Sequence, residues 1–319
     1  MSHLLHADAA GVEAAVVALR AGRLIGLPTE TVYGLAGNLH NDQAMLRIFS
    51  VKGRPVDHPL IVHIADAEHL HQLSDHVSPA CQALVDNCWP GPLTVIVTAN
   101  AGVSRIATGG RDTVAVRMPA HPVARRVIEL LGAPVAAPSA NRFGRVSPTT
   151  AQHVAIDLHE YLGKDVALVL DGGSCEIGVE STIVDCTLTA PQILRPGAIT
   201  QDDVQRLLGL VRVTLDHTVT GPSRASGMLE RHYAPTARLL LEEPMDQDEQ
   251  RVSSDSDVNR ESLPTIDCSQ NPLQSAHDLY SLLRANDEAG HSVVRVILPR
   301  AQGIGFALRD RLHKAAASK

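Results

Sequence analysis

The stretch SVKGRPVDHPLIVHI, residues 50–64, indicates the fold class because one predicted element ends in it and another begins. Residues 42–52 (DQAMLRIFSVK) predict a helix that Gly53 and Pro55 stop. Residues 59–64 (PLIVHI) form an apolar run that predicts a buried strand. A helix that passes through a short polar loop into a buried strand indicates a protein of mixed helices and strands.

The rest of residues 1–212 repeats this alternation of helices and strands. Apolar runs predict strands at 23–28, 93–99, 113–119, 166–171 and 181–186, and helical patterns predict helices at 8–21, 78–88 and 121–132. We therefore expect an α/β or α+β domain with a mixed sheet. Several strands end at loops rich in Gly, Ser, Thr, Pro or Arg, and such loops are where ligand sites usually collect.

The chain is expected to contain two domains. Residues 1–212 form the first, and residues 213–236, which have many turn formers and little periodicity, predict a linker. Residues 237–319 predict a second, smaller α/β domain. Its expected elements are strands at 237–243 and 292–299 and helices at 275–290 and 305–318. The acidic stretch 242–262 predicts a solvated loop.

Composition restricts the functional classes. The 319 residues carry 28 basic and 35 acidic side chains, a net charge of −7, which argues against a surface built throughout for nucleic acid. The five cysteines form no C-x-x-C pair, so we expect free thiols in a reducing cytoplasm. No apolar run reaches about 18 residues and no basic region opens the chain, so neither a membrane span nor a signal peptide is expected.

Cations lie at the ends of several elements. Lys52 and Arg54 lie where a helix ends; they either complement its macrodipole or form a cradle for a polyanion with the neighbouring Gly and Pro residues. Arg117 lies within an apolar strand, where a charge needs a carboxylate partner or an anionic ligand. His63 lies within another strand and is either a core histidine or a site residue.

Hydroxyl and amide side chains occupy the loops. PTETVYGLAG (28–37) carries Thr29, Thr31 and Tyr33 on a turn that either binds a ligand or is a capped strand-to-helix turn. Other loops supply Ser139, Asn141, Ser147, Ser181 and Arg195, the first three in a stretch that alternatively caps a helix near Pro148. No P-loop, nucleophile elbow or nucleophile–base pair is found, so the pattern favours phosphoryl or nucleotidyl transfer, in which a protein mainly positions and neutralises.

Ordered motifs give the chain a family resemblance. They are PTETVYGLAG (28–37), KGRPVDHPLIVHI (52–64), PGPLT (90–94), VAVRMP (114–119), APSANRFGRVSPT (137–149), GVESTIVD (178–185) and ILRPG (193–197). In this order they resemble the YrdC-type threonylcarbamoyl-AMP synthases. SGMLERHYAPTA (226–237) resembles the linker of their two-domain, SUA-type form. The resemblance implies an α/β fold: a YrdC-like domain with a twisted mixed sheet, then a linker and a smaller Rossmann-like α/β domain.

The resemblance also implies a reaction, a nucleotidyl transfer. L-threonine, bicarbonate and ATP, with Mg²⁺ on the triphosphate, would give threonylcarbamoyl-AMP and pyrophosphate. The product would pass to a tRNA threonylcarbamoyl-transfer complex, which modifies the adenosine beside the anticodon. Any contact of this chain with tRNA itself would be weak, and no membrane is involved.

The residues that match the family's motifs divide into two groups. By similarity the threonine pocket contains Thr31, His63, Arg117 and Ser181, with Arg117 set to pair the threonine carboxylate. By similarity the ATP site contains Lys52, Arg54, His58, Thr113, Ser139, Asn141, Ser147, Arg195 and Tyr233. Lys52 and Arg54, at the phosphates, are the catalytic candidates.

Two positions depart from the family pattern. His58 stands where members often carry Asn, which would change the pH dependence of ATP binding. Ala137 stands where some members carry a hydroxyl, so one threonine contact would be lost.

The alternative functions are an RNA-binding module with a basic cleft and a carbamoyltransferase that uses a carbamoyl-adenylate. The general base is open, and His63 is a candidate only by proximity.

Overall fold

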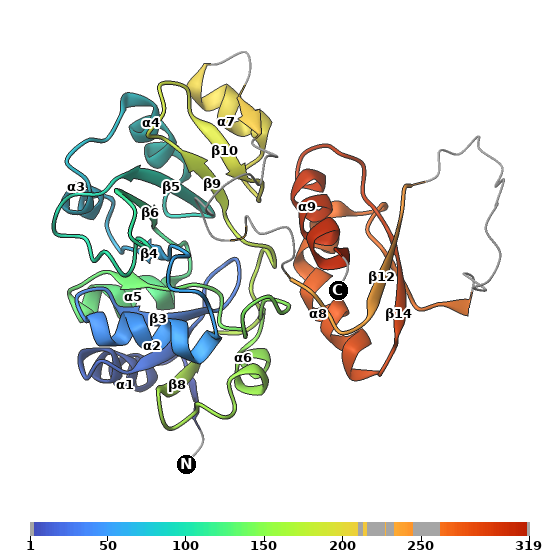
Figure 1. The fold of residues 1–319 in the computed structure, drawn as a ribbon, viewed down its shortest axis with the longest axis horizontal. Helices are drawn as coiled ribbons and strands as arrows, with labels where there is room; N and C mark the ends of the chain where they lie inside the picture. Colours follow the sequence, from blue (N-terminus) through green and yellow to red (C-terminus); the bar gives the residue numbers. More distant parts are fainter. Residues whose placement is uncertain (1–2, 210–212, 216–226, 228–232, 245–261, 318–319) are drawn as a thin grey trace.

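The computed structural model shows two domains of unequal size, the larger one at the N-terminal end of the chain and the smaller one at the C-terminal end (Figure 1). It describes residues 3–209, 213–215, 227, 233–244 and 262–317. Most of the predicted linker and of the acidic stretch 242–262 lies outside the described residues. No helix among the described residues is both long enough and apolar enough to span a membrane.

The larger domain is built on a mixed sheet of eleven strands in the order β1-β8-β2-β3-β7-β4-β6-β5-β9-β10-β11. The strands are β1 (Leu4–His6), β2 (Leu24–Leu27), β3 (Gly34–Asn38), β4 (Ile61–His63), β5 (Leu93–Thr98), β6 (Thr113–Arg117), β7 (Val135–Ala136), β8 (Val166–Asp171), β9 (Thr182–Asp185), β10 (Gln192–Arg195) and β11 (Thr214–Leu215). β2 is parallel to β8 and antiparallel to β3, and β6 is parallel to β4 and antiparallel to β5. The predicted mixed sheet is confirmed.

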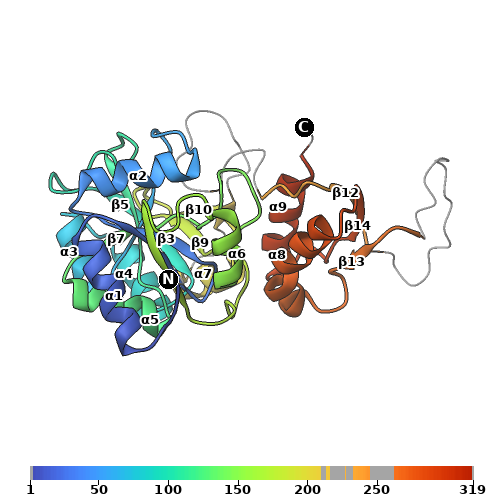
Figure 2. The same cartoon turned by 90° about the horizontal axis from the view of Figure 1, so that it is seen from below.

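Helices cover both faces of this sheet. They are α1 (Ala9–Arg20), α2 (Asp42–Lys52), the 3₁₀ turn η1 (Ala67–His69), α3 (Leu70–Leu73), α4 (Pro79–Cys88), α5 (Pro122–Leu131), α6 (Ala151–Asp157) and α7 (Gln201–Leu208). Successive strand residues face opposite sides, so Leu24 joins the apolar cluster of α2, whereas Ile25 joins that of α1 and α5. Figure 2 shows α2 and the pair α1 and α5 on opposite sides of the strands.

The helix in the opening stretch has the predicted bounds. α2 begins after Asn41, whose side chain accepts a hydrogen bond from the backbone N–H of Ala44, and ends at Gly53 in the left-handed conformation at φ 65°. A glycine pays no steric penalty there, which explains why the helix stops at this residue. The chain then enters β4, whose residue His63 lies beside Arg117 of the parallel strand β6.

Of the two alternatives for the turn at 28–37, the structure excludes the capped strand-to-helix turn. PTETVYGLAG is not a strand-to-helix turn, because its second half forms β3, antiparallel to β2. The strand GLAGN is almost wholly buried but contains no β-branched residue, which removes the usual sequence signal. A side chain at Gly37 would meet Leu24 Cδ2 at 3.0 Å and Met45 Cε at 3.1 Å, so α2 packs directly on the bare backbone of β3.

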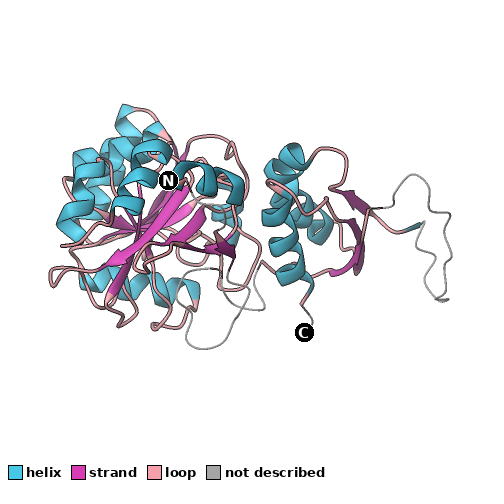
Figure 3. Ribbon diagram, turned by 90° about the horizontal axis from the view of Figure 1, so that it is seen from above, coloured by secondary structure: helices cyan, strands magenta, loops and turns pink. Residues whose placement is uncertain are grey.

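The smaller domain has a three-stranded parallel sheet in the order β12-β14-β13. Its elements are β12 (Arg238–Glu242), β13 (Thr265–Asp267), α8 (Pro272–Glu288), β14 (Val293–Ile297) and α9 (Gly305–Ala316). Figure 3 shows both helices between the small sheet and the larger domain. Their apolar residues, such as Leu279 and Leu308, share one cluster with Val32, Val146 and Val179 of the larger domain. The expected smaller α/β domain is confirmed.

Candidate active site

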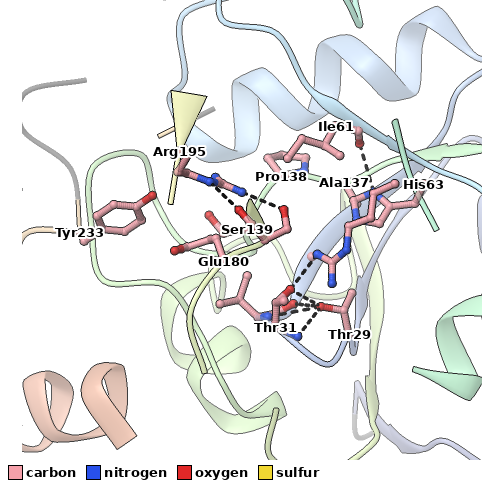
Figure 4. A pocket seen from close by; sticks show the side chains of 14 residues that line it. Thr29, Thr31, Ile61, His63, Ala137, Pro138, Ser139, Glu180, Arg195 and Tyr233 are labelled. Atoms are coloured by element: carbon pink, nitrogen blue, oxygen red, sulfur yellow. Dashed lines mark hydrogen bonds between the residues drawn. The ribbon is translucent and has the colours of Figure 1, made fainter. Parts of the chain in front are cut away.

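A cavity lies where strand ends of the larger domain meet, close to the smaller domain (Figure 4). Arg117 at the end of β6 lies opposite Thr94 of β5, and Leu93 lies opposite Thr182 of β9, so these ends share one edge of the sheet. The cavity is lined by Thr29, Thr31, Val32, Gly34, Ile61, His63, Arg117, Ala137, Pro138, Ser139, Glu180, Ser181, Arg195 and Tyr233. All four residues predicted for threonine line it.

Arg117 is held by three protein groups. Its Nη2 lies 2.6 Å from Glu30 Oε1, and both side chains are only 4% exposed. Nη1 donates to Thr31 Oγ1 at 2.8 Å, and Nε donates to the carbonyl of Gly91 at 3.2 Å. Of the two partners considered from the sequence, the carboxylate is therefore present. Each terminal nitrogen still carries a second N–H, so the fixed guanidinium can also serve a ligand.

The charge state of Glu30 follows from this pairing. Burial pushes the pKa of the Glu30 carboxyl upward, but the charge of Arg117 and its hydrogen bond outweigh burial and hold the pKa below its ordinary value. Glu30 is thus ionised, and the pair Glu30–Arg117 is neutral as a unit. The wall of the cavity at this point offers oriented N–H donors with little net charge.

The turn before β3 fixes the hydroxyl of Thr31. Thr29 Oγ1 donates its only proton to the carbonyl of Val32 at 2.6 Å, so the 3.0 Å contact between the two threonine hydroxyls uses the proton of Thr31. Thr31 Oγ1 therefore faces the cavity as an acceptor. The hydroxyl of Tyr33, expected on the same turn, instead donates to the carbonyl of Gly173 at 2.7 Å.

His63 is both a buried histidine and a residue of the cavity wall. It is 3% exposed, and its Nδ1 lies 3.1 Å from the carbonyl of Ile61, so Nδ1 carries the proton and Nε2 is an acceptor. Burial, together with the charge of Arg117, lowers the pKa of His63 to about 3. The imidazole is neutral near pH 7 and is a weak base there.

Lys52 and Arg54 lie behind the cavity wall rather than in it. Lys52 Nζ donates at 2.5 Å to the carbonyls of Ser139 and Asn141, so it fixes the loop that carries the predicted nucleotide residues. Burial and the charge of Arg54 lower the pKa of the Lys52 ammonium well below its usual range. Arg54 donates to the carbonyl of Pro59 at 2.9 Å and lies over the Phe143 ring at 5.7 Å.

The loop at 137–150 places three predicted side chains differently. Ser139 lines the cavity. Asn141 donates at 2.8 Å to the carbonyls of Arg142 and Arg145, and its Oδ1 is buried with no hydrogen-bond partner among the described residues. The hydroxyl of Ser147 donates to Glu180 Oε1 at 2.6 Å. Asn141 thus ties the loop from within and Ser147 ties it to Glu180, and Asn141 Oδ1 stays a buried acceptor without a partner among the described residues.

The opposite wall combines a hydroxyl with an arginine. Arg195 Nη2 donates to Ser181 Oγ at 3.0 Å, and Arg195 Nε donates to the Ser181 carbonyl at 3.0 Å. Ser181 Oγ also lies 2.7 Å from Thr94 Oγ1. Burial, partly offset by its neighbours, lowers the pKa of Arg195, which is 2% exposed and remains a cation at neutral pH. Figure 4 shows Arg195, Glu180 and Tyr233 together, across the cavity from His63.

The remaining predicted residues lie nearby but do not line the cavity. His58 is half-buried and packs edge-on against Phe143 at 5.5 Å, and burial followed by the charge of Arg54 lowers its pKa. Thr113 begins β6, two residues before Ala115, the register partner of Ile61, so it lies beside the loop that leads into β4. Neither residue meets the threonine-side residues directly.

Sequence reasoning missed one carboxylate of the wall and its partners. Glu180 lines the cavity and accepts hydrogen bonds from Tyr280 of α8 at 2.8 Å and from Arg311 of α9 at 2.9 Å. A signal existed for Arg311, because Leu308, Arg311 and Leu312 share one buried helix face, and a charge in such a stripe implies a buried partner.

No cluster of three or more His, Cys, Asp or Glu side chains suited to a metal ion occurs among the described residues. The two carboxylates of the cavity wall, Glu30 and Glu180, are each paired with an arginine. All five cysteines are free thiols.

Two family models match the chain. The model described as "Telomere recombination" (Sua5/YciO/YrdC) matches residues 17–197, and the model described as the C-terminal domain of threonylcarbamoyl-AMP synthase matches residues 199–317.

Individual relatives match over nearly the whole chain. The threonylcarbamoyl-AMP synthase of Pyrococcus abyssi is 39% identical over 323 residues, covering 93% of this chain and 92% of that protein. The Bacillus subtilis protein of the same name is 37% identical over 324 residues, covering 96% of this chain and 92% of that protein. The crystal structure of P. abyssi Sua5 complexed with L-threonine has a TM-score of 0.87 at 36% identity, covering 99% of this chain and 97% of that one.

Proposed function

Because the chain belongs over both domains to the family of threonylcarbamoyl-AMP synthases, we propose that it makes threonylcarbamoyl-AMP and pyrophosphate from L-threonine, bicarbonate and ATP. The family resemblance of the sequence motifs is confirmed. One observation carries the proposal: the fixed guanidinium of Arg117, suited to a carboxylate, and the cation Arg195, suited to a phosphate, line the same cavity.

The threonine end of the cavity is the wall around Arg117. Its two terminal nitrogens each have an N–H to spare, which suits the two oxygens of an amino-acid carboxylate. Thr31 Oγ1 and His63 Nε2 are acceptors, so they suit the ammonium or hydroxyl of threonine. The similarity to P. abyssi Sua5, whose crystal structure is a complex with L-threonine, supports this assignment.

The chemistry needs positioning more than acid–base groups. The threonine amine and bicarbonate give a carbamate with loss of water, and a carbamate oxygen then attacks the α-phosphorus of ATP as pyrophosphate leaves. Both partners are anionic, so the protein must hold them close and neutralise charge. We assign His63 to orientation, because an imidazole with a pKa of about 3 is too weak a base to take up a proton effectively at neutral pH. This argues against His63 as the general base.

We place the triphosphate along Arg195, Ser139 and the loop that Lys52 fixes. Arg195 meets it at the cavity wall, whereas Lys52 holds the Ser139 carbonyl from behind and Arg54, with a pKa of about 10, adds positive charge there. Asn141 Oδ1 offers an acceptor for an N–H or O–H of the nucleoside. Since the carboxylates of the wall are engaged by arginines, the Mg²⁺ ion would arrive as part of the substrate, bound to the phosphates.

The product would leave for a tRNA threonylcarbamoyl-transfer complex in the cytoplasm, where it serves the adenosine beside the anticodon. Threonylcarbamoyl-AMP is a reactive mixed anhydride, so a second protein must accept it soon after release. The net charge of −7 supports only weak direct contact with tRNA.

The test is pyrophosphate release by the purified protein with ATP, Mg²⁺, threonine and bicarbonate. We expect release that requires both threonine and bicarbonate, with threonylcarbamoyl-AMP detected by mass spectrometry. Release without threonine, or none at all, contradicts the proposal. Steeply salt-dependent tRNA binding without turnover would favour an RNA-binding module instead, and turnover of carbamoyl phosphate would favour a carbamoyltransferase.

A further inference from the structure

The carboxylate of Glu180 lies between the cavity and the smaller domain. It is 6% exposed and directly precedes Ser181 in the cavity wall. Ser147 Oγ donates to its Oε1 at 2.6 Å, and its Oε2 accepts from Tyr280 at 2.8 Å and from Arg311 at 2.9 Å. Two of its three donors thus come from the smaller domain. This carboxylate is where the two domains meet the candidate ATP site.

Arg311 is wholly buried at the centre of this contact. Its Nη1 lies 2.5 Å from Asp310, its neighbour on α9, and its guanidinium lies over the Tyr233 ring at 5.4 Å. Tyr233, another residue of the cavity wall, stacks on Tyr280 with ring centroids 5.8 Å apart. Burying a guanidinium is costly unless carboxylates surround it, and apolar side chains would fill the same space at no such cost. Packing of the interface alone therefore does not explain why an arginine occupies this position.

The charges around Glu180 indicate what Arg311 contributes there. Arg195 of the cavity wall donates to the hydroxyl and carbonyl of Ser181, and its charge, after that of Arg311, also lowers the pKa of Glu180. Without Arg311, Glu180 would lose its direct ion pair and the larger of the two arginine charges that offset it, so more negative charge would face the site in which a polyanionic nucleotide has to bind. Its hydrogen bond to Ser147, in the predicted nucleotide loop, would also lose its fixed geometry.

We propose that Arg311 and Tyr280 of the smaller domain are positioning residues for the synthase reaction, which they support by neutralising and orienting Glu180 beside the ATP site. This inference rests on the proposed function and gives the smaller domain a role in it. Neither residue touches a reacting atom; both act through Glu180, and through it on Ser147 and the cavity wall.

The first test compares two arginines of the same helix. Arg311→Met removes the charge that faces Glu180, and Arg309→Met removes one whose pair, Glu243, lies 2.5 Å away within the smaller domain. Pyrophosphate release should show the KM for ATP raised by about tenfold or more in Arg311→Met. The KM for threonine should change far less, and Arg309→Met should match the natural protein. An unchanged KM for ATP in a folded Arg311→Met variant overturns the inference.

A double variant separates positioning from simple loss of structure. If Arg311 acts by neutralising Glu180, Glu180→Gln should lower the raised KM for ATP when it is combined with Arg311→Met. If the two changes weaken ATP binding independently, the inference is wrong. Should Arg311→Met fail to fold, Tyr280→Phe decides, since it keeps the ring stacking and removes one hydrogen bond to Glu180. A raised KM for ATP in that variant supports the inference, and a natural value overturns it.

The design also separates this inference from the proposed function. If the natural protein releases no threonine-dependent pyrophosphate, the proposed function fails. If the natural protein is active and the Arg311 and Tyr280 variants share its KM for ATP, only the inference about the smaller domain fails.

Discussion

At the scale of the residue, the hydrogen-bond geometry of Arg117 gives the most specific prediction about substrate binding. Its three nitrogens each have a protein partner, and two of them keep an N–H for a ligand. Lysine in its place would keep a charge beside Glu30 but would lose the planar fork. We expect Arg117→Lys to raise the KM for threonine about tenfold or more and to leave the KM for ATP nearly unchanged. Steady-state kinetics with each substrate varied in turn gives both values.

Two outcomes would contradict the assignment of Arg117 to the threonine carboxylate. Equal increases in both KM values would mean that Arg117 holds the nucleotide as well, and an unchanged KM for threonine would move the carboxylate elsewhere. Arg117→Met is the less useful variant, because it leaves Glu30 charged and buried, and breaking a buried pair in this way costs about 3–5 kcal/mol. A change in folding would then mask the change in binding.

His63 gives a prediction about pH. Its folded pKa of about 3 lies below the value of about 6.5 for a free histidine. The ring should therefore stay neutral from pH 9 to about pH 5, and its NMR signals, assigned with a His63→Gln variant, should not titrate there. As the pH falls below about 6.5, His63 becomes protonated in the unfolded chain but not in the folded protein. Burial of this neutral imidazole therefore lowers the free energy of unfolding progressively as the pH falls from about 6.5 toward 3. A titration step near pH 6.5 would contradict the assigned burial.

The four residues that the sequence motifs assign to threonine, Thr31, His63, Arg117 and Ser181, all line the cavity. The motifs could not reveal what these groups contact. The carbonyls that hold Lys52 lie 87 and 89 residues away along the chain, and the donors to Glu180 from the smaller domain lie 100 and 131 residues away. Such partners follow from the packing of distant elements, and no local pattern records them.

At the scale of the element, the ends of the helices were the most predictable features. Asn41 and Gly53 mark the ends of α2, and Gly132, in the left-handed conformation, ends α5 at the predicted position. Four short strands, β1, β7, β11 and β13, were missed because two or three residues cannot show a period. β3 was missed for a different reason, since it is built from Gly, Leu, Ala and Asn and its stability comes from burial rather than propensity.

The close approach of α2 to β3 gives a prediction at this scale. A side chain at Gly37 would lie 3.0 Å from Leu24 Cδ2, 3.1 Å from Met45 Cε and 3.3 Å from Ile48 Cδ1. Gly37→Val should therefore lower the free energy of unfolding by about 1–3 kcal/mol, because the helix must move outward. Gly102→Val is the control, since it lies on an exposed loop. Denaturant titrations measure both, and equal values would show that α2 does not need the bare backbone.

At the scale of the whole molecule, the interface between the domains is part of the core. Val32, Val146 and Val179 pack with the helices of the smaller domain, and Arg284 of α8 pairs with Asp157 at 2.6 Å. The buried contacts of Glu180 lie within the same interface. An interface that is apolar and also carries buried ion pairs favours one fixed arrangement of the two domains. If one domain slid along the other, the paired charges would separate and stay buried without partners. The docked smaller domain thus contacts two residues of the cavity wall, since Tyr280 and Arg311 bind Glu180 and Tyr280 stacks on Tyr233.

Gly178 tests this contact between the domains, because it lies where the loop before Glu180 touches the backbone of α8. A side chain there would meet the carbonyl oxygen of His277 at 2.4 Å and that of Ala276 at 2.5 Å, and both are backbone atoms that cannot turn aside. Gly173 lies five residues earlier with a similar φ, 85° against 81°, but open space surrounds the position of its Cβ. Both substitutions by alanine carry the strain of the left-handed conformation, about 1–2 kcal/mol, and only Gly178→Ala also pushes against α8.

We expect Gly178→Ala to lower the free energy of unfolding by about 1–3 kcal/mol more than Gly173→Ala. The added loss should come with a raised KM for ATP, because moving α8 draws Tyr280 away from Glu180. Thermal or denaturant unfolding and steady-state kinetics on the two variants give the comparison. If the two alanine variants are equally stable and bind ATP equally well, the close contact of this loop with α8 is not what holds the smaller domain at the cavity.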